Sequence, residues 1–188
     1  MKKIIAIDVD NVLFQINTMD YVNRVLGTNY REEDFTDWEM NNLPKDVQDA
    51  AIAAWQDVRF MCYESKAIAG NHQILRKWNE QGHYLYAVTS RHNGLILDTV
   101  AQINNVYPGI FGDRIVFVND GSSKRSSKAK HFKKIGANVV IDDWYVEDGI
   151  SVGAKTVLIT NEKTPYNHSK RTNQNLYQAL SLCHARFE

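Results

Sequence analysis

Two aspartates stand directly after a short apolar stretch near the beginning of the chain. Residues 4–7 read Ile-Ile-Ala-Ile, and Asp8, Val9 and Asp10 follow. Such a run is typical of a strand buried on both faces, which leaves Asp8 at its carboxyl end. Residues two apart in an extended chain point to the same side, so the two carboxylates emerge together. Because close carboxylates repel, the pair predicts a cation or a shared proton beside it.

Two other roles are open to acidic residues at this position. A single Asp after a strand is commonly a turn residue or a helix cap. Asp-x-Asp also begins the EF-hand calcium loop, which requires an oxygen ligand at its fifth position and Gly at its sixth. Those positions hold Val12 and Leu13 here, and a strand precedes them instead of a helix. We therefore reject the calcium loop and keep the turn as the alternative to a functional site.

Polar side chains also follow two later apolar stretches. They are Thr89 and Ser90 after residues 84–88, and Asp142 and Asp143 after residues 138–141. The carboxyl ends of parallel strands meet at one edge of a sheet, so we expect these groups to converge with Asp8 and Asp10. Lys128 begins a Lys-rich helix where the chain returns to this edge, which predicts a cation at the site. Lys124 and Lys130 are the alternatives for that role.

Strand and helix patterns alternate along the rest of the chain. Further strands are expected at residues 84–88, 114–118, 138–141 and 156–159, and helices at residues 95–103, 127–135 and 172–185. This alternation is typical of an α/β protein, in which a parallel sheet with right-handed crossovers is covered by helices on both faces.

The first crossover, residues 14–80, is too long for one helix. It carries helical patterns at residues 19–26, 44–60 and 67–80. We therefore expect a Rossmann-like core formed by residues 1–16 and 81–188, and a helical cap formed by residues 17–80. The helix near residues 67–80 can be assigned to either unit.

Composition and charge exclude several classes of protein. Of 188 residues, 44% are hydrophobic and 23% charged, and 22 Lys and Arg balance 22 Asp and Glu. No net field therefore attracts nucleic acid or a membrane surface. No apolar run reaches the roughly 20 residues of a membrane span, and the first run is too short for an export signal. Cys62 and Cys183 match no zinc spacing and read as free thiols. We expect a cytoplasmic protein, with its oligomeric state open, a homodimer included.

Together the motifs resemble the haloacid dehalogenase (HAD) superfamily of phosphatases. The matching residues are Asp8-Val9-Asp10 with the following Val12-Leu13, Thr89 after a hydrophobic strand, Lys128, and Ile141-Asp142-Asp143. The resemblance covers the whole chain and implies a three-layer Rossmann-like fold with a small helical cap after the first strand. It looks most similar to the 5′(3′)-deoxyribonucleotidase branch, which removes phosphate from nucleoside monophosphates. Asn11 departs from the branch's pattern of Gly or Asp, and we do not expect it to touch the chemistry.

The residue types support a two-step hydrolysis of a phosphate ester. An aspartate can attack phosphorus and form an aspartyl phosphate, the role expected for Asp8. Asp10 can protonate the leaving oxygen and then deprotonate water. Thr89, Ser90 and Lys128 can bind the phosphate oxygens, although Thr89 can equally cap the next helix.

The resemblance also implies a Mg²⁺ site. Its expected ligands are the carboxylates of Asp8 and Asp142 together with the backbone carbonyl of Asp10. Asp143 is then expected to orient a metal-bound water or the lysine. Mg²⁺ commonly binds one or two carboxylates together with phosphate oxygens and water.

Specificity is expected to come from the cap. Its aromatic residues could stack on a base or form the core of the cap itself, and they include Phe14, Phe35, Trp38, Trp55, Phe60 and Tyr63. Phe14 and Trp38 are the preferred stacking residues, and Arg91 either contacts substrate or pairs with a surface acid. The leading hypothesis is a Mg²⁺-dependent phosphatase for nucleoside monophosphates. The alternatives are a phosphatase for another small metabolite, an enzyme that processes nucleic-acid ends, and a catalytically silent binding domain.

Overall fold

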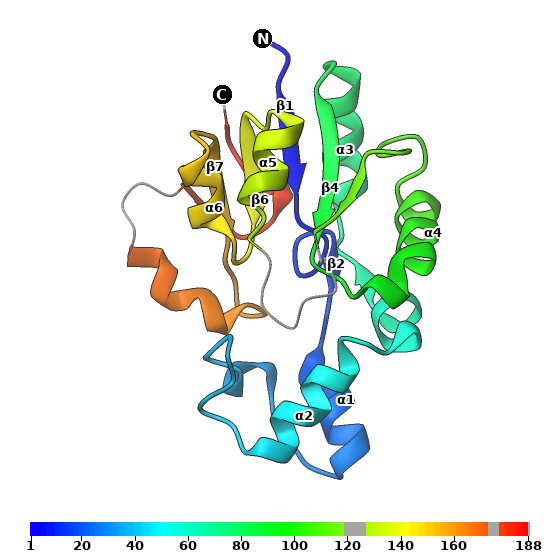
Figure 1. The fold of residues 1–188 in the computed structure, drawn as a ribbon, viewed down its shortest axis with the longest axis vertical. Helices are drawn as coiled ribbons and strands as arrows, with labels where there is room; N and C mark the ends of the chain where they lie inside the picture. Colours follow the sequence, from blue (N-terminus) through cyan, green and yellow to red (C-terminus); the bar gives the residue numbers. More distant parts are fainter. Residues whose placement is uncertain (119–126, 173–176, 188) are drawn as a thin grey trace.

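A six-stranded sheet forms the centre of the molecule, with helices on both of its faces (Figure 1). The computed structural model describes residues 1–118, 127–172 and 177–187. The strand order is β5-β4-β1-β6-β7-β8, and all neighbouring strands are parallel. The strands are β1 (Ile4–Ile7), β4 (Tyr84–Thr89), β5 (Ile115–Phe117), β6 (Val139–Asp142), β7 (Lys155–Ile159) and β8 (Tyr177–Ala179). The predicted α/β class with a three-layer Rossmann-like sheet is confirmed.

The described helices divide between the sheet and the long first crossover. They are α1 (Thr18–Leu26), α2 (Lys45–Ala54), α3 (Asn71–Glu80), α4 (Ile96–Val106), α5 (Ala129–Ile135) and α6 (Val146–Ser151). A π-helical turn, η2 (Arg59–Glu64), and the 3-10 turns η1 (Glu32–Asp34), η3 (Asn93–Leu95), η4 (Pro165–Thr172) and η5 (Leu182–His184) complete the described helical structure. The helix expected at residues 44–60 thus ends at Ala54, and the π-helical turn follows it.

Strand β1 lies in the middle of the sheet, paired with β4 on one side and β6 on the other. Its alternate residues point to opposite faces. Ile5 and Ile7 lie in a buried cluster with Leu75 of α3, whereas Ala6 lies in a second cluster with Phe132 of α5. Burial on both faces therefore explains why β1 is entirely apolar and why the first polar residue, Asp8, comes directly after the strand.

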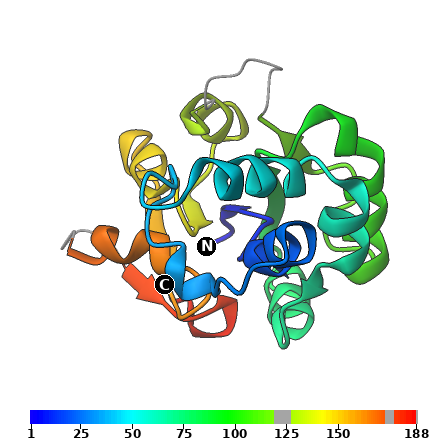
Figure 2. The same cartoon turned by 90° about the horizontal axis from the view of Figure 1, so that it is seen from below.

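A short ribbon carries the chain from the sheet into a helical insertion and back. Strands β2 (Phe14–Gln15) and β3 (Lys66–Ala67) pair antiparallel and form this ribbon. The insertion, residues 16–65, has its own buried cluster, in which Met19 and Val22 of α1 pack near Val47 and Ala51 of α2. Seen from below, the insertion lies across the carboxyl ends of the strands (Figure 2). In the described part of the chain, no helix has both the length and the apolar character needed to cross a membrane.

The prediction of a helix at residues 172–185 is wrong. Residues 173–176 lie outside the described residues, but Tyr177–Ala179 forms β8 and pairs with β7 at the edge of the sheet. The side chains of this segment do not bury one helical face, because Leu180 is 60% exposed while Ala179 and Leu182 are buried. The open edge of β7 supplies backbone partners that favour a strand here, and spacing alone does not distinguish a short strand from a helix.

Candidate active site

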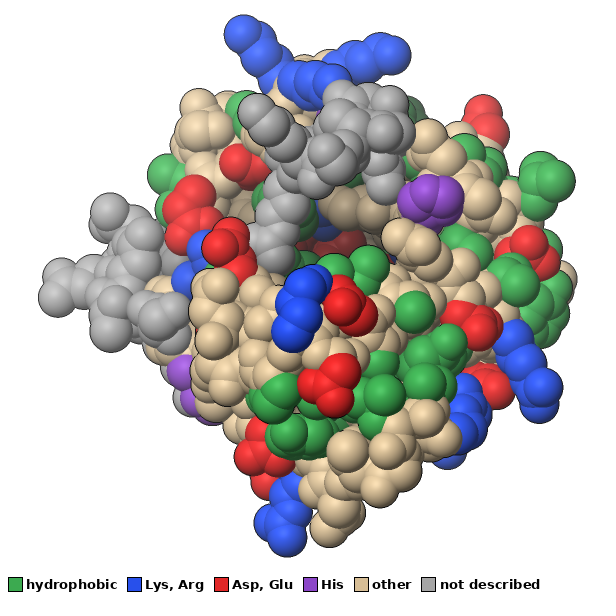
Figure 3. Space-filling model, turned by 60° about the horizontal axis from the view of Figure 1, so that its bottom comes forward, with side chains coloured by type: hydrophobic (Ala, Val, Ile, Leu, Met, Phe, Trp, Pro, Cys, Tyr) green, Lys and Arg blue, Asp and Glu red, His purple; other side chains and the backbone are tan. Residues whose placement is uncertain are grey.

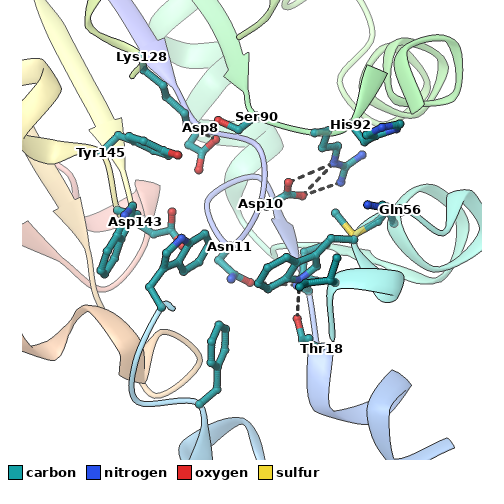
Figure 4. Close-up of a pocket in the computed structure, with 18 residues that line it drawn as sticks. Asp8, Asp10, Asn11, Thr18, Gln56, Ser90, His92, Lys128, Asp143 and Tyr145 are labelled. Atoms are coloured by element: carbon teal, nitrogen blue, oxygen red, sulfur yellow. Dashed lines mark hydrogen bonds and ion pairs between the residues drawn. The ribbon is translucent and has the colours of Figure 1, made fainter. Parts of the chain in front are cut away.

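A cavity of about 240 Å³ lies between the carboxyl edge of the sheet and the insertion (Figure 4). Acidic and basic side chains from the strand ends line one side of it, and aromatic side chains line the other. Figure 3 shows the hollow from outside, with acidic side chains inside it and apolar side chains on the surface beside it. The predicted convergence of polar groups at this edge is therefore observed.

Lys128 lies at the centre of the polar side. It immediately precedes α5 and is 1% exposed. Its Nζ donates to Oδ1 of Asp8 at 2.7 Å, to Oδ2 of Asp142 at 2.8 Å and to the carbonyl of Val88 at 3.2 Å. Burial alone would lower the pKa of Lys128, but the two carboxylates raise it above its ordinary value, so the side chain stays charged. Of the alternatives, Lys130 is exposed and Lys124 lies outside the described residues.

Three carboxylates gather beside this lysine. Oxygen atoms of Asp8, Asp142 and Asp143 lie within 4.8 Å of one another, and all three residues are buried. Burial, together with the neighbouring carboxylates, raises the pKa of Asp8 well above its ordinary value, although Lys128 opposes this. The same causes raise the pKa of Asp143 to about 7. One ammonium group cannot balance three carboxylates, so the cluster has the charge and the oxygen donors that suit a divalent cation.

The two members of the second acidic pair are held differently. Both oxygens of Asp142 accept hydrogen bonds, Oδ2 from Lys128 and Oδ1 from the backbone amides of Trp144 and Tyr145 at 2.8 and 2.7 Å. Asp143 instead accepts a hydrogen bond at Oδ2 from the hydroxyl of Tyr166. Asp142 is therefore committed to its protein partners, while Asp143 faces the cavity.

Asp10 lines the same cavity but is not in the carboxylate cluster. Its Oδ1 accepts from Nε and Nη2 of Arg91 at 3.0 and 2.8 Å (Figure 4). The prediction that Arg91 would pair with a surface acid is wrong, because its guanidinium is 0% exposed and its partner is a site residue. The prediction that it contacts substrate stays a prediction.

The two hydroxyl residues after β4 also differ. Ser90 lines the cavity near Asp8 (Figure 4). Thr89 is fully buried, is not among the residues that line the cavity, and accepts at Oγ1 from the backbone amide of Arg91 at 3.1 Å. Thr89 therefore makes a local contact in the loop after β4 and does not cap the next helical turn, whose N-cap is His92. Ser90 is the more accessible hydroxyl.

Stacked rings form the opposite side of the cavity. We call Phe35, Trp38, Trp55 and Trp144 the aromatic wall. The ring of Trp38 is stacked on Trp55 at 5.7 Å and on Trp144 at 5.2 Å between centroids, with interplanar angles of 13° and 19°. Trp55 is anchored by a 3.1 Å hydrogen bond from its Nε1 to Oγ1 of Thr18.

Phe14 takes no part in this wall, so its prediction as a stacking residue is wrong. It pairs through β2 with β3 and is 1% exposed. Its ring lies edge-on to Tyr107 at 5.7 Å within the core cluster of the sheet. A ring enclosed on all sides offers no face to a ligand.

Tyr166 and Asn11 are site residues that sequence reasoning missed. Tyr166 lies in η4, and its buried hydroxyl donates to Asp143 and accepts from Nδ2 of Asn11 at 2.8 Å. Asn11 lines the cavity and holds Tyr166, while the expectation that it does not touch the chemistry stays a prediction. Its backbone φ of 58° suits Asn, which tolerates the left-handed region better than most residues. Burial and Asp143 raise the pKa of Tyr166 well above its ordinary value, so the hydroxyl remains a donor.

No protein-family model and no curated protein matches this sequence. Solved structures share its fold. A HAD hydrolase of family IA, variant 3, from Entamoeba histolytica has 16% identity and a TM-score of 0.64, with 100% of this chain and 96% of the other covered. A predicted phosphatase from Clostridium acetobutylicum has 14% identity and a TM-score of 0.63, with 98% and 97% covered.

A HAD family hydrolase from Deinococcus radiodurans R1, crystallised with bound phosphate and sodium, has 16% identity and a TM-score of 0.61, with 95% and 91% covered. At such identities the likeness establishes the fold. The HAD-like fold that the sequence motifs implied is therefore confirmed, and the motif residues lie at the sheet edge where that resemblance places them.

Proposed function

We propose that the protein is a Mg²⁺-dependent phosphomonoesterase that hydrolyses nucleoside monophosphates, deoxynucleotides included. The observation that carries this proposal is the pairing of two unlike surfaces in one cavity. Asp8 lies 2.7 Å from the buried ammonium of Lys128 on one side, and the aromatic wall lies on the other. The first surface suits a phosphoryl group, and the second suits a flat base.

The side chains divide the reaction between them. Asp8 attacks phosphorus and forms an aspartyl phosphate, while the leaving oxygen takes a proton from Asp10. Water then attacks the aspartyl phosphate and loses a proton to Asp10, which restores both carboxyl groups. Lys128 stabilises the negative charge of the transferring group, and Ser90 donates to a phosphate oxygen.

The carboxylates of Asp8 and Asp143 and the backbone carbonyl of Asp10 would hold the Mg²⁺ ion. When bound, the ion neutralises charge on the phosphoryl group. This proposal exchanges the expected roles of Asp142 and Asp143: Asp143 becomes the metal ligand, and Asp142 becomes the residue that orients the lysine. Asp142 already uses both oxygens to hold Lys128 and the start of α6.

We further propose that the insertion acts as the cap that selects substrates. It contributes three of the four rings of the aromatic wall, Phe35, Trp38 and Trp55. Helix α3, which was open to assignment, packs into the core cluster of the sheet through Leu75 and Trp78, so we group it with the core. The cavity, at about 240 Å³, lies at the small end of ligand-binding pockets. This size favours a single mononucleotide over the end of a nucleic-acid strand as the substrate.

A panel of phosphate esters tests the substrate. Purified protein with Mg²⁺ should release phosphate from deoxynucleoside and ribonucleoside monophosphates, and more slowly from sugar phosphates that lack a ring to stack. No turnover of any nucleoside monophosphate, together with rapid turnover of a sugar phosphate, would favour the alternative of another small metabolite.

Metal removal tests the cofactor. Excess chelator should stop phosphate release, and added Mg²⁺ should restore it, because the carboxylate cluster then regains its counter-charge. Full activity in excess chelator would contradict the proposed metal site. Both described cysteines are free thiols, which fits the cytoplasmic location we propose.

A further inference from the structure

Arg91 is a buried cation, and each of its three guanidinium nitrogens donates a hydrogen bond to a neighbouring side chain. Its Nε and Nη2 donate to Asp10, and its Nη1 donates to Oε1 of Gln102 at 2.8 Å and to Oγ1 of Thr99 at 3.2 Å. Both of these acceptors belong to α4. The ring of Phe14 lies beneath the guanidinium, 5.8 Å from its central carbon. The core of the protein therefore encloses most of the Arg91 side chain, which borders the cavity beside Asp10.

Burial of an arginine costs free energy unless a carboxylate compensates for it. Among the described residues, Asp10 is the one carboxylate that forms an ion pair with Arg91. The pair is asymmetric, because the Arg91 side chain is 0% exposed while the Asp10 side chain is 27% exposed and lines the cavity. The core thus fixes the position of Arg91, and Arg91 in turn fixes the position of the accessible Asp10.

We propose that Arg91 is a positioning residue that holds the carboxyl group of Asp10 where the leaving group departs. The inference rests on the proposed phosphatase function. A guanidinium that donates two hydrogen bonds to one carboxylate restricts its rotation as well as its place. Arg91 itself does not touch the reacting atoms, and the network with Gln102 and Thr99 leaves it little freedom to reach substrate.

The role of Asp10 in both steps makes this position testable. In the first step a carboxylate oxygen of Asp8 forms a bond to phosphorus while the bond from phosphorus to the leaving oxygen breaks. The electron pair of the broken bond goes to the leaving oxygen, and Asp10 donates a proton to it. In the second step water forms the new bond to phosphorus, Asp10 takes the water proton, and the electron pair of the broken bond returns to Asp8. An ester whose leaving group is stable as an anion, such as p-nitrophenyl phosphate, needs no proton in the first step.

Misplacing Asp10 should therefore affect two kinds of ester differently. In Arg91→Met, turnover of an alkyl ester such as a nucleoside 5′-monophosphate should fall by about 100-fold, within the usual contribution of a general acid or base. With p-nitrophenyl phosphate, the same variant should release a rapid burst of about one nitrophenol per protein molecule and then turn over slowly. The burst marks an intact nucleophile and metal site with a slow second step.

A double-mutant comparison separates positioning from direct substrate contact. If Arg91 acts through Asp10, the variant carrying both Arg91→Met and Asp10→Asn should be no slower than Asp10→Asn alone. Arg91→Lys keeps the charge but not the pair of hydrogen bonds to Asp10, so it should recover part of the lost turnover of the alkyl ester. If Arg91→Met does not fold, Arg91→Lys tests the same difference between the alkyl ester and p-nitrophenyl phosphate. Arg114→Met is the matched control. Among the described residues, Arg114 donates only to the backbone carbonyls of Leu85 and Ile110, and it is not among the residues that line the cavity. The variant should leave turnover of both esters unchanged.

The outcomes distinguish the two proposals. Wild-type protein that hydrolyses neither ester would overturn the proposed function and the inference with it. Active wild-type protein, with equal losses on both esters and no burst in the Arg91 variants, would overturn the positioning role alone. Multiplied losses in the double variant would assign Arg91 to the substrate instead.

Discussion

The two sides of the cavity are built in contrasting ways. On the acidic side, Asp8, Lys128 and Asp142 come from the ends of strands and the start of a helix, and hydrogen bonds of 2.7–2.8 Å link them. On the aromatic side, Trp38 and its neighbours come mostly from the insertion and touch through ring faces. Under the proposed function, the sheet carries the reacting groups, whereas the insertion shapes the side of the cavity that the leaving group of the substrate would meet.

One side chain belongs to both sides. The hydroxyl of Tyr166 donates to Asp143, and its ring lies 5.0 Å from Phe35 and 4.8 Å from Trp38 between centroids. Trp144 makes a similar link along the chain, because it directly follows Asp143 and stacks on Trp38. The orientation of the Asp143 carboxylate and the packing of the aromatic wall are therefore connected through two residues.

The largest effect should come from the acidic side. Asp8→Asn should abolish phosphate release from every ester, because an amide cannot form the aspartyl phosphate. The fold should persist, since Lys128 keeps its ion pair with Asp142. Phosphate release and circular dichroism measure the two outcomes. Equal turnover by wild type and variant would remove Asp8 from the mechanism.

The link between the two sides should give the next largest effect. Tyr166→Phe keeps the ring in the wall but removes the donor to Asp143. Loss of such a supporting hydrogen bond typically costs about 10–100-fold in metal affinity or activity. The Mg²⁺ concentration that half-activates the enzyme should rise accordingly.

The control for this variant is Tyr107→Phe, since the Tyr107 hydroxyl donates only to the carbonyl of Leu13 in the core. It should change stability but not the Mg²⁺ requirement. Equal shifts in the two variants would show that the effect of Tyr166 is not specific to the site.

A change in the wall should alter substrate preference and leave the chemistry intact. Trp38→Ala removes the central ring that orders the aromatic wall, so a base that packs against this wall should lose roughly 1–3 kcal/mol of binding. We expect a higher KM for nucleoside monophosphates, by about tenfold or more, with little change for a small aliphatic phosphate. If both kinds of ester lose activity equally, the wall does not select the base.

The smallest effect concerns the stability of the insertion. Oε1 of Glu32 accepts from the backbone amide of Met19 in the first turn of α1, at 2.6 Å. Burial raises the pKa of Glu32 from its ordinary 4.5 to about 7. Between pH 4.5 and about pH 7, the folded protein therefore keeps a proton on Glu32 that the unfolded chain has already lost. Above about pH 7 Glu32 is ionised in the folded protein as well and destabilises the fold, whereas below pH 4.5 it has no such effect.

Glu32→Gln should therefore raise the free energy of unfolding at pH 8, on the order of 1 kcal/mol, and leave it unchanged at pH 4. Denaturant titrations at the two pH values measure this difference. Equal effects of the substitution at both values would contradict the assigned shift.

The contrast between the two sides also explains what could be predicted from sequence. Asp8, Lys128 and the second acidic pair were predictable, because the carboxyl ends of parallel strands must share one edge. Tyr166 could not be placed, since its contact with Asp143 depends on how the chain turns back after β7. Trp144 did carry a signal, because an aromatic residue that directly follows a site carboxylate must lie near the cavity.

The errors have a common physical origin. Phe14 was expected at the cleft because it lies near a loop that faces the cleft, but the β2–β3 ribbon turns its side chain into the core. The tail was expected to be helical because its apolar spacing suited a helix, but backbone pairing with β7 formed a strand instead. In both places, a partner distant in sequence decided the conformation, and local spacing contains no record of that partner.

The proposed aspartyl phosphate is tested most directly by trapping it. Wild-type protein mixed with p-nitrophenyl phosphate and Mg²⁺, quenched in acid within milliseconds and cleaved into peptides, should carry one phosphoryl group on the peptide that contains Asp8. Asp8→Asn should carry none. A phosphoryl group on another residue, or none at all in a rapidly turning-over enzyme, would contradict the covalent role of Asp8.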